Sequence, residues 1–182
     1  MNILDAILGA QGGGAAAAAG QKLGLSPEQT SAALAVLVPA LATGLQRNAL
    51  LPGGLDALVG ALAKGGHARY IDDPTTLQNN DAVSDGNAIL GHVLGSKDES
   101  RKVASQAAAE TGIGEDVLKK LLPIAASMVM GALAKQPIGG AAVAAGMPGA
   151  GILAVLTPIL DRDRDGSMVD DVLGQVGKIF KR

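Results

Sequence analysis

Residues 118–133 constrain the fold more than any other segment of the sequence. After Lys120 this stretch is apolar on almost every side of a helix. A helix of that kind must be surrounded by protein, because it has no polar face to turn toward water. We therefore predict a central buried helix here, with the other elements packed around it. The chain shows no run of alternating β-branched residues, so the sequence indicates no sheet.

Proline recurs inside apolar, helix-like runs at Pro39, Pro123 and Pro158, each time in a Leu-x-Pro context. A proline inside a helix costs about 3 kcal/mol unless a kink or a fresh helix start absorbs it. We interpret the three prolines as kinks in helices that wrap around a common core. The predicted fold class is all-α, a multihelical orthogonal bundle built from kinked helices with internal quasi-repeats.

Two further patterns organise the chain. Residues 3–9 loosely resemble residues 89–95, and residues 56–60 resemble residues 170–174, which indicates quasi-repeated units. The only extended polar stretch lies between them. We therefore predict an N-terminal helical half over 1–65, a linker over 66–86, and a C-terminal helical half over 87–182. The last part ends in an acidic loop and an amphipathic helix.

Local signals place several helix ends. Ser26, with proline next and Gln29 three residues on, is typical of a capping box, and residues 96–99 repeat that pattern. Asp73 before Pro74 indicates another start. The apolar residues of the last segment fall on one stripe of a helix, which makes 168–180 the clearest amphipathic pattern in the chain.

Composition limits the core and the possible partners. Of the 182 residues 48% are hydrophobic, yet there is one Tyr, one Phe and no Trp. The core must therefore be aliphatic, and platforms for stacking on bases are absent. A net charge of −2 supplies no field for capturing nucleic acid. The chain has no cysteine, which excludes disulfides and thiol chemistry.

Two segments are candidates for a membrane or export signal, and neither is predicted to be one. The first five residues lack the positive charge of a signal peptide, so we predict a cytoplasmic protein. Residues 136–160 are uncharged and long enough to span a bilayer, but prolines and glycines interrupt them. We interpret this stretch as a loop followed by a buried helix, and expect no membrane span.

One block of the sequence, residues 85–101, reads Asp85-Gly86-Asn87-Ala88-Ile89-Leu90-Gly91-His92-Val93-Leu94-Gly95-Ser96-Lys97-Asp98-Glu99-Ser100-Arg101. This block resembles the YidB-like family of bacterial proteins, known as domain of unknown function 937. Residues 69–74, 118–123 and 130–133 continue the resemblance. It implies a multihelical fold. It implies no catalytic activity, cofactor or binding residues.

Residues 161–167, with the sequence DRDRDGS, are the one segment with recognisable ligand chemistry. Calcium prefers six to eight oxygens, and an Asp-x-Asp-x-Asp-Gly run supplies carboxylates at alternate loop positions. The twelfth position is Val172 rather than glutamate, so an aspartate just before it must substitute in a shortened loop. The candidate calcium ligands are Asp161, Asp163, Asp165, Ser167, Asp170 and Asp171. Bound calcium would be a structural clamp. The alternative is a solvated loop whose Ser167 and Asp170 cap the final helix.

No catalytic residues are predicted. The two histidines, His67 and His92, lack further donors at a zinc-site spacing. A triad of His92, Ser96 and Asp98 is not needed, because Ser96 is already explained as a helix cap. Paired acids beside Tyr70 are typical of a turn, and a pocket lined by Asp72, Tyr70 and His67 would be the sign of an enzyme instead.

The sequence therefore predicts a non-enzymatic helical protein that acts through self-association or contacts with another protein, as a homo-oligomer or filament. Repeated helical modules need partners to cover their end faces. The alternative is a weak nucleic-acid-binding protein that uses helix 96–111, where Lys97, Arg101 and Lys102 lie. Its acidic net charge argues against that, and no nucleic acid is expected as a partner.

Overall fold

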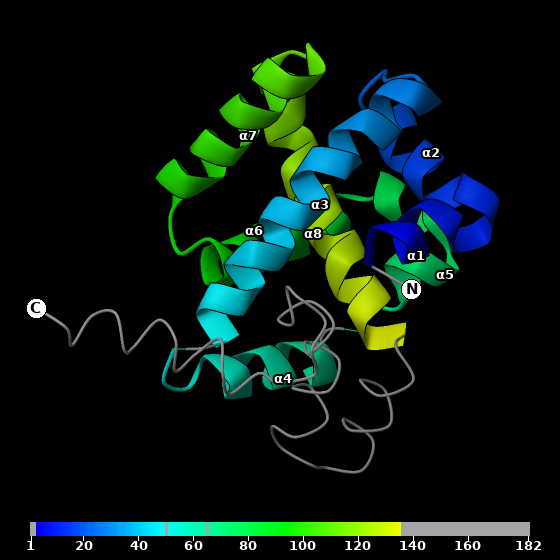
Figure 1. Cartoon of the computed structure of the whole chain (residues 1–182). Helices are drawn as coiled ribbons and strands as arrows, with labels where there is room; N and C mark the ends of the chain where they lie inside the picture. Colours follow the sequence, from blue (N-terminus) through cyan, green and yellow to red (C-terminus); the bar gives the residue numbers. More distant parts are fainter. Residues whose placement is uncertain (1–2, 50, 65, 136–182) are drawn as a thin grey trace, which may run out of the picture.

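The computed structural model describes residues 3–49, 51–64 and 66–135. These residues form helices joined by short turns, with no strand among them, which confirms the predicted all-α bundle (Figure 1). The elements are α1 (Ile3–Gly9), η1 (Ala10–Gly13), α2 (Gly14–Gln21), α3 (Pro27–Ala49), α4 (Gly54–Lys64), α5 (Arg69–Asp72), η2 (Pro74–Gln78), α6 (Asn80–Val93), α7 (Lys97–Thr111) and α8 (Glu115–Lys135), where η marks a 3₁₀ helix.

Helix α8 forms the centre of the bundle. Every residue from 121 to 133 is buried, as the all-round apolar pattern predicts. Helices α3, α6 and α7 pack against it (Figure 1). By length and composition α8 is apolar enough to cross a membrane, but most of it is buried within the protein, as in the core helix of a soluble fold. Its neighbours therefore account for its hydrophobicity.

The contact between α6 and α8 depends on small residues. A Cβ on Gly86 would lie 1.9 Å from the carbonyl oxygen of Pro123, so the two backbones touch at that point. Nearby, the buried Ser127 hydroxyl donates a hydrogen bond of 2.7 Å to the carbonyl of Ala82. Pro123 lies inside α8, and Pro39 lies inside α3, so both prolines interrupt the bonding of a continuous helix. Pro158 lies outside the described residues.

The predicted helix ends are confirmed at three places. Ser26 and Gln29 form a reciprocal capping box, with hydrogen bonds of 3.2 and 3.0 Å. Ser96 accepts a bond of 3.1 Å from the backbone N–H of Glu99 at the start of α7. Asp73 caps η2 by accepting from the backbone N–H of Thr75.

Residues 66–86 form part of the packed bundle, in place of the predicted linker. They carry α5, η2 and the first half of α6, and the side chains of Tyr70 and Leu77 are completely buried. Their polar residues, which suggested a linker, instead cap helices or form ion pairs. Helix α3 of the predicted N-terminal half packs directly on α6, α7 and α8 of the other half.

Candidate functional site

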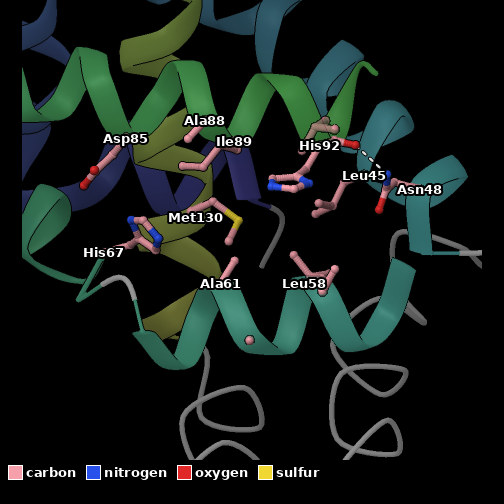
Figure 2. Close-up of a pocket in the computed structure, with 13 residues that line it drawn as sticks. Leu45, Asn48, Leu58, Ala61, His67, Asp85, Ala88, Ile89, His92 and Met130 are labelled. Atoms are coloured by element: carbon pink, nitrogen blue, oxygen red, sulfur yellow. Dashed lines mark hydrogen bonds between the residues drawn. The ribbon is translucent and has the colours of Figure 1, made fainter. Parts of the chain in front are cut away.

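A pocket of about 530 Å³ opens between α4 and α6, with α3 and α8 behind it. Figure 2 shows α6 on one side, α4 on the other, and Met130 of α8 between them. The lining is mostly aliphatic, and a volume of this size is typical of sites that take small molecules or the side chains of a partner. We call it the inner pocket. Its main apolar residues are Leu45, Leu58, Ala61, Ile89, Val93 and Met130.

Polar side chains stand at the two ends of the inner pocket. His67 and Asp85 lie at one end, and His92 and Asn48 lie at the other (Figure 2). Asp85 and His92 are seven residues apart on α6, which is about two turns, so they share a helix face. At the far end, the side-chain amide of Asn48 donates to the carbonyl of His92 and ties α3 to the end of α6.

Asp85 is held by a compact hydrogen-bonded group. Its carboxylate accepts a bond of 2.6 Å from the Tyr70 hydroxyl and forms an ion pair of 3.0 Å with Arg69. The Arg69 guanidinium also donates to the Tyr70 oxygen at 2.8 Å and stands 4.8 Å from the centre of its ring. Burial, followed by the neighbouring Asp85 carboxylate, raises the pKa of the Tyr70 phenol. The phenol therefore stays protonated near neutral pH and braces α5 against α6.

His67 is enclosed rather than accessible. Its exposed fraction is 6%, and its Nδ1 is shielded from water without a hydrogen-bond partner. Burial lowers the pKa of the imidazole, while the nearby Asp85 carboxylate partly opposes that effect. The ring is therefore neutral near pH 7. His67 therefore lines the inner pocket with a neutral, mostly buried imidazole.

A second hollow, of about 240 Å³, lies beside the inner pocket near the end of α3. The two share Asn48, His92 and Val93, so they adjoin one another. The second hollow, which we call the outer groove, adds Leu51, Leu94 and the charged residues Arg47 and Glu99. Leu51 is 60% exposed and is the large hydrophobic side chain that stands out to solvent in the described part of the chain. The inner pocket and outer groove together are the apolar groove.

The six candidate calcium ligands, Asp161, Asp163, Asp165, Ser167, Asp170 and Asp171, lie outside the described residues. Within residues 3–49, 51–64 and 66–135, no three histidine or carboxylate side chains are grouped so that they could hold a metal ion. The calcium site stays a prediction.

The other residues weighed from the sequence are separated by the fold. Ser96 caps α7, and Asp98 forms an ion pair of 2.9 Å with Arg101. Asp72 pairs with Lys135 at the end of α8. Of the three residues that would have indicated an enzyme, only His67 lines the inner pocket, where its carboxylate neighbour is Asp85.

Helix α7 is formed over Lys97–Thr111, close to the predicted range of 96–111. Its basic side chains are exposed, but two of them are paired within the helix. Arg101 pairs with Asp98 at 2.9 Å, and Lys102 pairs with Glu99 at 2.7 Å. Lys97 and Arg101 also line a hollow of about 660 Å³ beside Lys119, which itself pairs with Glu115. These acids offset much of the positive charge.

Sequence reasoning missed the apolar groove because its residues come from five helices and the turns between them. Asp85 and His92 carried a usable signal, since their spacing of seven places them on one helix face. No comparable signal links them to Asn48, Leu51 or Met130, which are brought near only by packing.

Comparison with known proteins gives one match. The model of a family described as a bacterial protein of unknown function, DUF937, matches residues 5–136 and includes the block 85–101 that carries the resemblance. No curated protein and no solved structure matches the chain. The matched range includes both parts of the apolar groove.

Proposed function

The chain belongs to the DUF937 family of bacterial proteins of unknown function, and on that premise we propose that it is a non-enzymatic interaction protein that acts through self-association. The apolar groove is its binding surface. The observation that carries this proposal is the pair of adjoining hollows, with a mostly aliphatic lining and Leu51 exposed at the rim. A concave, mostly apolar surface of this kind is typical of a binding site.

The chemistry of the groove supports binding more than catalysis. His67 has its free nitrogen shielded from water, and the Tyr70 phenol and Asp85 carboxylate are engaged with each other and with Arg69. General acid–base work requires a group within hydrogen-bond reach of a substrate proton. In contrast, Ala61 and Val93 in the groove are only partly buried and Leu51 at its rim is exposed, so this apolar surface gains free energy when it is covered.

Self-association is tested with the full chain by sedimentation velocity over a wide range of concentrations. We expect the weight-average mass to rise above that of one chain as concentration increases. Leu51→Asp should weaken association by at least about tenfold, because a charge then sits where apolar surface is covered. Ala109→Asp, on the exposed side of α7, is the matched control and should assemble like the parent. A monomer at every concentration, or full assembly of Leu51→Asp, would contradict the proposal.

A structural calcium ion in the loop 161–171 is a second part of the proposal. Three aspartates at alternate positions repel one another, and a bound cation relieves that repulsion. Titration calorimetry with calcium should give a binding heat and a raised melting temperature, both reduced by Asp163→Asn. The absence of heat and of any melting shift in the parent would end the idea. The same sedimentation experiment, with and without calcium, reports whether the loop affects assembly.

Nucleic-acid binding through helix α7 is the less favoured alternative. The acids that pair with Arg101 and Lys102 reduce the positive charge that the helix offers. A gel shift that weakens steeply with salt would favour this alternative, since neutralised phosphates release counterions.

A further inference from the structure

No element within residues 3–49, 51–64 and 66–135 covers the apolar groove, and the sequence contains a segment whose apolar face has no assigned partner. We infer that residues 168–180 of a second copy of the chain bind in the apolar groove. This inference rests on the proposed self-association and names the element that carries it. The segment lies outside the described residues and beyond the family match, which ends at residue 136.

The segment has the pattern of a helix that binds in a groove. Such helices insert apolar side chains at positions i, i+3 or i+4, and i+7 into a hydrophobic cleft. Residues 168–180 carry a stripe at that spacing, and the intervening positions are polar or glycine. The apolar residues are Met168, Val169, Val172, Leu173, Val176, Ile179 and Phe180.

The apolar groove offers a matching series of sites. Leu51 and Leu94 line its outer part, and Leu58, Ala61 and Met130 line its inner pocket. The two parts adjoin at Val93, so a row of side chains on one helix face would meet apolar side chains in both. The volume of about 530 Å³ in the inner pocket leaves room for several aliphatic side chains.

The charge at the outer end of the groove sets the direction of the segment. Arg47 lies at the outer end, and Glu99 at that end is neutralised by Lys102 at 2.7 Å. Asp85 lies at the inner end. The segment begins with Asp170 and Asp171 and carries Lys178 about two turns later. Asp85 is already paired with Arg69 at 3.0 Å, so Arg47 decides the placement, and we place the acidic start of the segment beside it.

A sequence similarity gives independent support. Residues 170–174 repeat the pattern of residues 56–60, which lie in α4. Helix α4 already forms one wall of the inner pocket through Leu58 and Ala61 (Figure 2). A segment with the same pattern therefore carries apolar side chains of the kind that already pack at this pocket.

Two variants of the full chain test the inference by sedimentation velocity. Leu173→Asp places a charge on the apolar stripe and should weaken association by at least about tenfold. Gln175→Asp adds the same charge to the polar side of the same segment and should leave association unchanged. Circular dichroism of each variant checks that the helical fold is retained.

A mixing experiment then separates exchange between copies from other arrangements. Leu51→Asp retains an intact segment, and Leu173→Asp retains an intact groove. Each should be monomeric alone, and their mixture should form a 1:1 dimer with no larger species. If the parent assembles and Leu173→Asp assembles equally well, or if the mixture stays monomeric, the inference is wrong while self-association stands. If the parent is monomeric at all concentrations, the proposed function itself fails.

Discussion

Two helix contacts in the bundle differ in how closely the backbones approach. One is the contact between α6 and α8, and the other is the contact of α4 with its neighbours. At Gly86 the backbone of α6 lies directly against the Pro123 carbonyl, so no side chain fits between the helices. Across the bundle, α4 stands away from α6, and the inner pocket of about 530 Å³ separates them. Small residues therefore give tight packing in one place and an open surface in the other.

The difference follows from what each helix has to bury. Helix α8 is apolar all round, so it gains free energy from every neighbour that closes on it. Helix α4 packs on α3 and α8, and toward the pocket its Leu58 is buried while Ala61 is only partly covered. A region that is packed to capacity supports stability, and a region that is left open is suited to binding.

The largest expected effect is at the close contact between α6 and α8. Gly86→Ala places a methyl group where only 1.9 Å is available and should lower the free energy of unfolding by about 3 kcal/mol or more. Gly91→Ala on the same helix has no atom within 4 Å of the added methyl group and should raise it by about 0.5–1 kcal/mol. Urea unfolding followed by circular dichroism measures both. Equal effects of the two substitutions would show that the close contact is not a real constraint.

A smaller effect on stability is expected from Ala→Leu substitutions, which compare the core with the groove. Ala125→Leu adds volume to the fully buried side of α8 and should destabilise the protein by about 2 kcal/mol. Ala61→Leu adds the same volume beside the inner pocket, where there is room for it, and should change stability by less than about 1 kcal/mol. If Ala61→Leu is as costly as Ala125→Leu in urea unfolding, the groove is closed in solution.

The smallest effect concerns pH and the buried imidazole at the end of the groove. Burial lowers the pKa of His67 in the folded state below its ordinary value of 6.5. Above that pH the His67 imidazole is neutral in both the folded and the unfolded state, so the free energy of unfolding has its full value. As pH falls below it, the unfolded chain takes up the proton first, so the free energy of unfolding decreases until the folded pKa is passed.

His67→Gln should therefore flatten the decrease in stability between about pH 7 and pH 5, the range in which a histidine titrates. The matched variant His92→Gln, at the exposed end of the inner pocket, should keep it. Thermal melting at a series of pH values is the measurement. A parent protein whose stability is constant over this range would contradict the burial of His67.

Much of the fold was predictable from local sequence. The buried α8 follows from apolar residues on all sides, and the starts of α3 and α7 follow from Ser26 and Ser96 with their partners three residues on. The stretch 66–86 was not predictable in this way. Its helices are short and rich in polar residues, and its place in the core depends on the burial of Tyr70 and on the pairing of Asp85 with Arg69.

The sequence by itself determined the helical class, the identity of the central helix and the family, because each depends on neighbours along the chain. Only the tertiary structure decided that His67, Asp85 and His92 border one pocket and that Leu51 stands exposed at its rim. The physical reason is that hydrogen bonds and periodicity within a helix are local, whereas a groove arises where helices distant in sequence pack without meeting.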